Sequence, residues 1–317
     1  MKILKSLIFI AILISGIGAS AHEACPEVNP HYENWPALHF RQPGRGWCYG
    51  VILADLLSVQ VHKPLSAIAL ANSVERSDDS YVNKAKAYIK RKSEILYRFS
   101  INGQPFLDAL NVAKKEKVCT WSILDRLRDQ PNIRDLFLDD VFANLEHQRR
   151  DQPEVFKATL HRLFDPLQRG FAEKLILQSE DKSKPLIDLA MDLSCVQKVD
   201  VATYDLESIT LGKTNDDAET INKLNSLLTH GTAVEIGYHE ELLTHPQSAE
   251  RERANHSSII VGQFMDSKDQ TCKYIIRATD LHTCDLVDKS VPCVNGYFVV
   301  PREEAISAAG QLMWLRH

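Results

Sequence analysis

The sequence lacks a surplus of positive charge, which argues against one broad class of function. It holds 37 Lys and Arg residues against 42 Asp and Glu residues, so its formal net charge is −5. Proteins that bind nucleic acids or anionic membranes without specificity carry the opposite balance. We therefore expect no nucleic-acid partner, and look instead to peptides, proteins or small molecules.

Long hydrophobic runs are missing beyond the first residues. The N-terminus has Lys2 and Lys5, then an apolar run over 7–14, then small residues at 19–21. This pattern is typical of a secretory signal peptide, which we expect to occupy residues 1–21. The apolar run is too short to cross roughly 30 Å of hydrocarbon, so an uncleaved anchor is the weaker alternative. The sequence predicts a secreted or periplasmic protein without an integral membrane span.

Internal repeats and low-complexity tracts are also lacking. The apolar fraction is 44% and the charged fraction is 25%, and these values exclude disordered and collagen-like chains. A chain of 317 residues can bury one large core or two modest ones. A two-lobed globular protein is the natural expectation.

Cysteines are few, and their number is odd. An exported chain with seven cysteines can form three disulfides and leave one thiol, and we expect Cys48 to be that thiol. Six cysteines admit 15 pairings, and the sequence does not choose among them. The three cysteines nearest the C-terminus are close enough for local loops. The six remaining cysteines are Cys25, Cys119, Cys195, Cys272, Cys284 and Cys293.

Helical patterns fill the first two thirds of the chain. Residues 49–61 are apolar nearly all round, which predicts a buried helix ending before Pro64. Residues 66–100 show an amphipathic pattern, which indicates a surface helix. The polar-rich patterns over 122–195 are interrupted by prolines, and their low apolar density predicts helices that decorate a lobe.

Strand patterns follow in the last third. After a helical pattern at 216–231, four segments rich in Ile, Val and Tyr predict strands. Helices first and strands later predict an α+β protein with a helical lobe and a sheet lobe. We expect the helical lobe at 22–200 and the β-rich lobe at 201–317. The four predicted strands are 232–238, 256–264, 272–279 and 296–300.

Two residues could form a catalytic pair across these lobes. Cys48 precedes the buried helix, and a helix N-terminus stabilises a thiolate through its dipole and its unpaired amides. A histidine from the opposite lobe could accept the thiol proton and later protonate a leaving amine. His256 opens the predicted strand "HSSIIVG", so we choose it over histidines on solvated helices. A structural, hydrogen-bonded histidine is the alternative at that position.

Taken together, "QPGRGWCYGVILA" and "NHSSIIVG" resemble the papain family of cysteine peptidases. In that family a glutamine lies six residues before the nucleophilic cysteine, a glycine lies two residues before it, and an aromatic residue follows it directly. Here Gln42, Gly46 and Tyr49 fill these places around Cys48. The resemblance implies a papain-like two-lobed fold with an active-site cleft between the lobes. It also implies that Gln42 and the Cys48 N–H stabilise the oxyanion.

The resemblance implies a cysteine-type endopeptidase that acts on a peptide or protein substrate. No cofactor and no metal are implied, and we expect a monomer. The glutamine-to-cysteine spacing is the most specific part of the likeness, which covers about 40–120 and 200–300.

The sequence departs from the family in two ways that matter here. The pair is separated by 256 − 48 = 208 residues, against 130–150 in the family, which we assign to helical insertions around 75–100 and 122–195. The family's orienting asparagine aligns with Ala278, which cannot accept the imidazole N–H. We expect Asp280 to hold the imidazole instead; its alternative role is to cap the turn that follows.

Other residues and functions stay open at this level. Trp47 could form a wall of the cleft or pack beneath it, Gly103 could contact substrate or serve a turn, and His282 is an alternative base. The segment "HEELLTH" at 239–245 has no zinc-protease spacing. Two rival functions are a pseudopeptidase that binds without turnover, and a cysteine–histidine amidase or acyltransferase.

Overall fold

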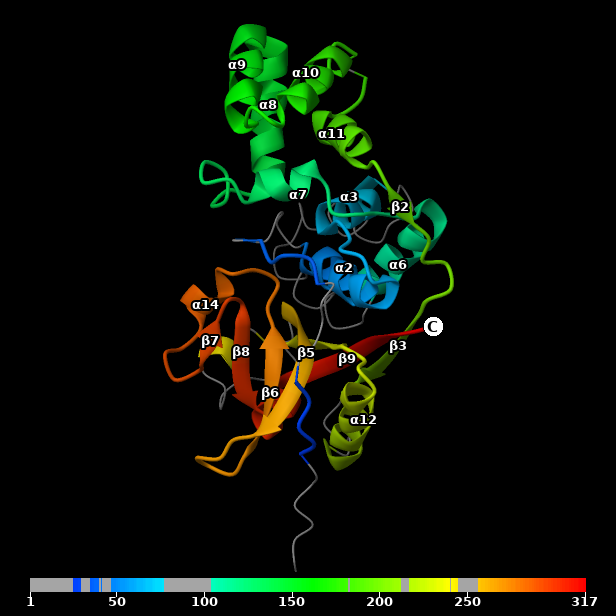
Figure 1. Cartoon of the computed structure of the whole chain (residues 1–317), viewed down its shortest axis with the longest axis vertical. Helices are drawn as coiled ribbons and strands as arrows, with labels where there is room; N and C mark the ends of the chain where they lie inside the picture. Colours follow the sequence, from blue (N-terminus) through cyan, green and yellow to red (C-terminus); the bar gives the residue numbers. More distant parts are fainter. Residues whose placement is uncertain are drawn as a thin grey trace, which may run out of the picture.

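The structure is a computed structural model, and it describes residues 25–29, 35–39, 41, 47–76, 104–181, 183–211, 217–239, 241–244 and 256–317. Three parts lie one above another in Figure 1: an outer group of helices, a middle group, and a sheet. The middle group holds α2 (Cys48–Val61), α3 (Ala67–Arg76) and α6 (Gln104–Glu116). The outer group holds α7 (Ile123–Arg128), α8 (Leu138–Asp151), α9 (Pro153–Leu163), α10 (Arg169–Gln178) and α11 (Leu186–Ser194).

A seven-stranded antiparallel sheet forms the other end of the molecule. Its strand order is β3-β9-β4-β5-β6-β8-β7, so the last strand of the chain is inserted between β3 and β4. The strands are β3 (Asp205–Thr210), β4 (Val234–Tyr238), β5 (His256–Met265), β6 (Cys272–Arg277), β7 (Cys293–Val294), β8 (Tyr297–Pro301) and β9 (Ala309–Arg316). The α+β architecture predicted from the sequence is confirmed.

Smaller elements complete the two ends. A two-stranded ladder, β1 (Val118–Cys119) with β2 (Lys198–Val199), joins the outer helices to the middle group. Helices α12 (Asp217–Thr229) and α15 (Arg302–Ala308) cover one face of the sheet, and α13 (Glu241–Thr244) and α14 (Thr283–Leu286) are single turns.

Helix α2 is buried nearly all round because it lies between α3 and the sheet. One core joins α2, α3 and α6 to sheet residues that include Ile259 and Met313. Ile52, Leu53 and Leu57 are fully buried. Each such side chain contributes about 1.5–3 kcal/mol through burial. This packing fixes the N-terminus of α2 against the sheet.

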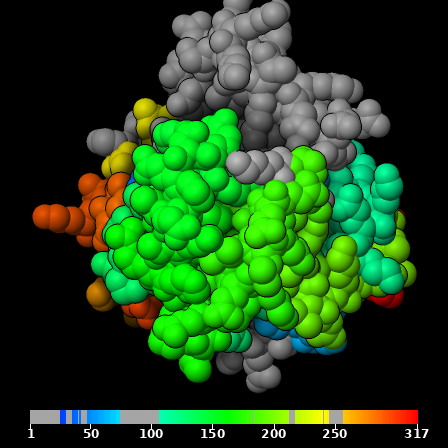
Figure 2. Space-filling view, turned by 90° about the horizontal axis from the view of Figure 1, so that it is seen from above, coloured from blue at the N-terminus to red at the C-terminus, as the bar shows by residue number. Residues whose placement is uncertain are grey.

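The outer helices enclose a core of their own, although their low apolar density predicts decoration. Leu124, Phe142, Phe156 and Leu160 are buried in it, together with Ile68 from α3. Helix α3 therefore serves two cores, one on each side. Figure 2 looks onto this end of the molecule, where the surface of α8, α9 and α10 (green) fills the front.

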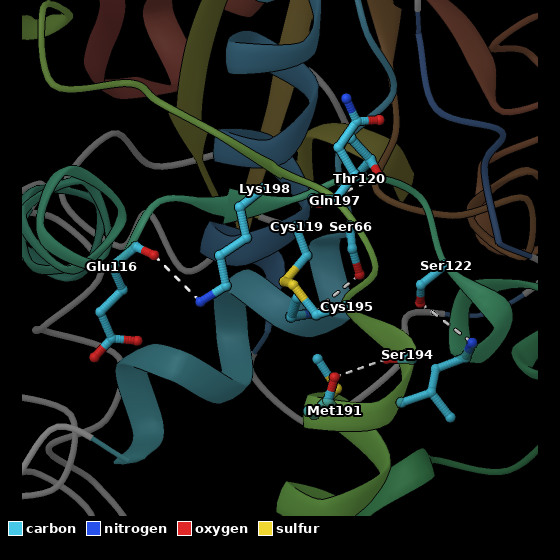
Figure 3. The surroundings of a disulfide bond; sticks show 12 residues. Ser66, Glu116, Cys119, Thr120, Ser122, Met191, Ser194, Cys195, Gln197 and Lys198 are labelled. Carbon is cyan, nitrogen blue, oxygen red and sulfur yellow. Dashed lines mark hydrogen bonds between the residues drawn. A yellow bond between two sulfur atoms is a disulfide. The ribbon is translucent and has the colours of Figure 1, made fainter. Parts of the chain in front are cut away.

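Three disulfides are present, and Cys48 lies outside them, as the sequence predicts. Cys119–Cys195 joins β1 to the end of α11, and Figure 3 shows it beside Ser66 and Ser194. Cys284–Cys293 closes a local loop. Cys25–Cys272 ties the N-terminal segment to the sheet, where Val28 also bridges to Gln263 of β5. The pairing of Cys272 is thus long-range.

Two predictions concern the N-terminal part of the chain. The expected signal peptide, 1–21, lies outside the described residues. Within the described ranges, no helix is both long enough and apolar enough to cross a bilayer. The division into lobes at residue 200 stays a prediction, and residues 25–28, although far from 201–317 in sequence, lie against the sheet.

Candidate active site

Cys48 is the first residue of α2. The Trp47 carbonyl accepts hydrogen bonds from the N–H groups of Gly50 and Val51, at 2.9 and 3.1 Å. The Cys48 side chain is partly exposed, whereas the next ten residues are all buried. The first turn carries no acidic side chain, so no carboxylate there reduces the positive potential of the helix N-terminus. This position favours the thiolate form of a cysteine.

The Trp47 side chain is 3% exposed and packs in the core of the outer helices. Of the two roles considered for it, packing in a core is the one observed. Its burial anchors the start of α2, and so helps to fix Cys48.

His256 is the first residue of β5, and it is half-buried. In the sheet register it lies opposite Tyr238, the last residue of β4. The two rings meet edge to face, with centroids 5.5 Å apart and an angle of 75° between their planes. The Tyr238 hydroxyl lies 2.9 Å from the Ser258 hydroxyl, which locks the tyrosine ring under the histidine.

Tyr238, the neighbour of His256 in the sheet, is fully buried. Burial is the main reason that the pKa of its hydroxyl is raised, and the hydrogen bond with Ser258 partly opposes this. Helix α2, which begins at Cys48, packs against β5, which begins at His256.

Asp280 follows β6 and is 9% exposed. Its Oδ1 accepts hydrogen bonds from the Thr283 N–H at 2.9 Å and the Thr283 hydroxyl at 3.0 Å. Its alternative role, capping the turn that follows, is therefore present in the structure. Ala278 is fully buried, and its N–H donates to the carbonyl of Gly296 at 2.8 Å.

Gln42 and Gly46 lie outside the described residues, as does Gly103. The residue before Gln42 is described: the Arg41 carbonyl accepts a hydrogen bond of 2.9 Å from the Arg128 side chain. This bond fixes the chain directly ahead of the predicted oxyanion donor.

The alternative base, His282, lies on the surface next to α14. Its Nδ1 is 3.0 Å from Asp285, and its side chain is 34% exposed. In the segment "HEELLTH", His239 lies 3.5 Å from Glu241, and His245 is outside the described residues. Among the described residues, no group of three or more His, Cys, Asp and Glu side chains is arranged to hold a metal ion.

One buried acidic residue near these residues was not predicted from the sequence. Glu235 is fully buried on β4, three residues before Tyr238, and its Oε1 accepts a hydrogen bond of 2.9 Å from Ser257. Burial raises the pKa of Glu235 to about 8, although hydrogen bonds from Ser257 and Gln311 partly oppose this. At neutral pH this side chain is therefore largely protonated and uncharged.

A buried ion pair joins α2 to β6, one residue before Ala278. Arg277 Nε donates to Asp55 at 2.8 Å, and both side chains are less than 5% exposed. Burial has the largest single effect and would lower the pKa of Arg277, but the charge and hydrogen bond of Asp55, together with Tyr297, raise this pKa overall. The guanidinium also lies over the ring of Trp35, 4.7 Å from its centroid. This pair fixes α2 relative to the strand that leads to Asp280.

A hollow of about 610 Å³ lies in the outer helices, apart from these residues. Its wall includes Trp121 and Arg126 near α7, and Leu167 and Phe171 near α10. Trp121 also stacks on the buried ring of His39. The hollow therefore borders the segment that precedes Gln42.

Comparisons with known proteins give only distant likenesses. No protein-family model matches the chain, and no curated protein sequence is similar to it. Digestive procathepsin L 3 from the larval midgut of Tenebrio molitor is 10% identical, over 95% of this chain and 72% of that one, with a TM-score of 0.43. PepW from Lactobacillus rhamnosis is 10% identical, over 95% and 83%, with a TM-score of 0.33. Similarity this low assigns neither a family nor an activity to the chain.

Proposed function

We propose that this protein is an exported thiol peptidase of papain-like design. One observation carries the proposal. Cys48, the cysteine outside the three disulfides, begins the buried helix α2, and that helix packs against β5, the strand that His256 begins. A partly exposed cysteine at a helix N-terminus, with a histidine nearby, is the arrangement that nucleophilic catalysis by a thiol requires.

The reaction divides into two steps. His256 takes the thiol proton, and the Cys48 thiolate attacks the carbonyl carbon of the scissile peptide bond. The negative oxygen of the tetrahedral intermediate accepts hydrogen bonds from the Cys48 N–H and the Gln42 side chain. The imidazolium of His256 then protonates the leaving amine, and a thioester remains on Cys48. A water molecule, deprotonated by His256, hydrolyses the thioester and restores the thiol.

Asp280 is the proposed positioning residue for His256. Its carboxylate is almost buried after β6, and in the sheet register Arg277 pairs with Ile259, so Asp280 and His256 each lie three residues beyond this pair. A carboxylate there would stabilise the imidazolium form, in place of the amide that Ala278 lacks. Loss of such a group weakens a thiol peptidase without abolishing its reaction, because the nucleophile, base and oxyanion donors remain.

Three disulfides support an exported location, because such bonds persist in oxidising compartments. The proposed substrate is a peptide or an unfolded protein, and the chemistry needs no metal and no cofactor. The chain would act as a monomer in the envelope or outside the cell.

The test is turnover by the disulfide-bonded protein. We expect cleavage of an unfolded protein substrate, measured by mass spectrometry of the fragments, and irreversible loss of activity on adding an epoxide inhibitor. Cys48→Ser and His256→Ala should abolish cleavage, because each removes a reacting group. His282→Ala, a change at a surface histidine, is the matched control and should retain activity. Equal activity in Cys48→Ser and the unchanged chain would overturn the proposal.

A pseudopeptidase is the second candidate, and two observations favour it. Ala278 is buried where the family has its orienting asparagine, and Asp280 is engaged by Thr283. This candidate predicts no cleavage and no epoxide labelling of Cys48 in the folded protein. An amidase or acyltransferase predicts turnover of small amides or cell-wall fragments and none of unfolded protein, so the same substrate panel separates all three.

A further inference from the structure

We propose that the hollow in the outer helices binds a peptide segment in which a bulky apolar residue stands next to an acidic one. The hollow measures about 610 Å³, within the range of roughly 300–1,000 Å³ that is usual for binding pockets. Neither Cys48 nor His256 is among the residues that line it. The inference goes beyond the proposed function, because binding here needs no reaction at Cys48.

The wall of the hollow comes from three stretches of the chain that are linked to one another. They are 120–130 with α7, 165–171 at the start of α10, and 193–196 at the end of α11. The Cys119–Cys195 disulfide joins the first stretch to the third, and beside it the Thr120 N–H donates to the Gln197 carbonyl at 2.9 Å (Figure 3). These bonds hold the wall in place before a ligand arrives, which lowers the cost of ordering it on binding.

The two most exposed large apolar side chains in the described part of the chain both lie on this wall. Leu167 is 97% exposed and Val196 is 93% exposed, whereas none of the others described is above 68%. Single apolar side chains are common at a protein surface, but two on the wall of one hollow mark a place where apolar groups are buried on binding. Phe171 adds aromatic surface beside them. The wall therefore favours a bulky apolar side chain.

Trp121 forms a further aromatic part of the wall, and its ring is fixed in place. It stacks on the ring of His39, with centroids 5.0 Å apart and planes within 14°. His39 is 2% exposed, and its Nδ1 lies 3.1 Å from Oδ1 of Asp129. The indole thus keeps its orientation at the wall, where it offers a rigid apolar surface to a ligand.

Two half-buried amide side chains on the wall match one peptide unit. Nε2 of Gln130 donates to Oε1 of Gln168 at 3.0 Å, which also joins the first stretch to the second. The other polar atoms of these amides are an acceptor, the Gln130 Oε1, and a donor, the Gln168 Nε2. A peptide unit offers the complementary N–H and C=O. This pair of amides therefore favours a peptide over a purely apolar ligand.

Among the described residues of the wall, Arg126 is the only cation. It is exposed on α7, and none of the described carboxylates forms an ion pair with it. Asp165, the acidic residue of the wall, already accepts a hydrogen bond of 2.9 Å from the Gln168 N–H, which caps the turn before α10. A guanidinium binds a carboxylate through two parallel hydrogen bonds. Arg126 therefore selects an acidic residue beside the apolar one.

Calorimetric titration with a defined peptide tests the site. The protein is the disulfide-bonded Cys48→Ser variant, so that no turnover takes place, and the probe is acetyl-Gly-Phe-Glu-Leu-Gly-amide, whose only charge is its glutamate. We expect binding, with Kd raised about 10-fold by Leu167→Ser and about 5-fold by Arg126→Gln. Leu177→Ser and Arg150→Gln, two exposed side chains outside the wall, are the matched controls and should leave Kd within twofold. All four side chains are exposed, so the variants should keep the fold.

A second peptide, with glutamine in place of glutamate, tests the charge pairing. It should bind the Cys48→Ser protein about 5-fold more weakly than the first peptide, and Arg126→Gln should weaken its binding no further. Additive losses would show that the peptide carboxylate does not meet Arg126, and would overturn the inference.

The remaining outcomes separate this inference from the proposed function. No binding below about 1 mM would overturn the inference alone, as would equal losses in the wall variants and their controls, because the peptide would then bind elsewhere. Self-association of the unchanged chain that Leu167→Ser abolishes, measured by sedimentation velocity, would also overturn it, since a second copy would then occupy the hollow. Selective binding by a chain that cleaves no peptide would support this site and overturn the proposed function alone.

Discussion

Glu235 is a carboxyl group held in its neutral form inside the sheet. It is fully buried on β4, and Ser257 donates to it at 2.9 Å. Burial is the main reason that its pKa is raised to about 8, and hydrogen bonds from Ser257 and Gln311 only partly oppose this rise. The folded protein therefore binds a proton at Glu235 between about pH 4.5 and 8, and the unfolded chain does not.

This difference predicts how stability depends on pH. A raised carboxyl pKa contributes stability that is present at low pH and is lost as pH rises from about 4.5 to 8, at up to about 1.4 kcal/mol per pH unit. Glu235→Gln keeps a neutral group of the same shape and should remove this slope. Urea unfolding at a series of pH values checks it, and an identical slope in both proteins would show that Glu235 is not protonated in the fold.

Single residues differ in how far the sequence reveals them. Cys48 could be chosen because the cysteine count is odd and a buried helix follows it. His256 could be chosen because it opens a strand. The roles of Glu235 and His39 could not be predicted, since their partners are distant in sequence; His39 and Asp129 are 90 residues apart. The sequence can place a polar residue inside an apolar pattern, but it does not show which distant residue will hydrogen-bond or pair with that side chain once it is buried.

Elements were predictable where their periodicity was clear. The pattern predicts α2, α12 and strands β4, β5, β6 and β8 close to their observed bounds. The pattern does not predict β9, which lies in the middle of the sheet. Its sequence, "AGQLMWLR", has no β-branched residue, and seven of its eight residues are buried, so neither composition nor alternation marks a strand. Its place is decided by pairing with β3 and β4.

The contact between α2 and α3 gives a prediction at the scale of elements. A Cβ atom on Gly50 would lie 2.8 Å from the Cβ of Ala71, so Gly50 permits the close approach of the two helices. Gly50→Ala should destabilise the protein by about 1–3 kcal/mol, although alanine has the higher helix propensity. Urea unfolding measures this change.

Gly170, on α10, offers a matched control for this substitution. A Cβ atom there would meet nothing within 4 Å, so Gly170→Ala should stabilise the protein by up to about 1 kcal/mol. If the two variants changed the free energy of unfolding equally, the close approach of α2 and α3 at Gly50 would not contribute to stability, and the prediction would be wrong.

At the scale of the whole molecule, three parts are joined by packing and by covalent links. Helix α3 contributes to the core shared with the sheet and to the core of the outer helices. The ion pair of Asp55 and Arg277 and the segment 35–41 join the same parts near the site. This arrangement packs α2, which begins at Cys48, against β5, which begins at His256, although the two residues are 208 positions apart.

The lengths of the loops that the disulfides close predict how much each disulfide stabilises the protein. The bonded cysteines are separated by 9, 76 and 247 residues, and in the chain-entropy account a longer loop restricts the unfolded chain more. Paired Cys→Ala changes at Cys119 and Cys195, or at Cys25 and Cys272, should each cost about 2 to 3 kcal/mol more than changes at Cys284 and Cys293. Urea unfolding of the three double variants checks the order. A cost for the shortest loop equal to the others would contradict it.

The pH dependence of Cys48 alkylation tests the central claim most directly. The other six cysteines are disulfide-bonded, so iodoacetamide reports on Cys48 alone. The account predicts rapid alkylation well below the ordinary thiol pKa of about 8.5, because a thiolate–imidazolium pair persists there, and a profile shifted towards that value in His256→Ala. If both proteins gave one shared profile that rises only near pH 8.5, Cys48 and His256 would not form a catalytic pair.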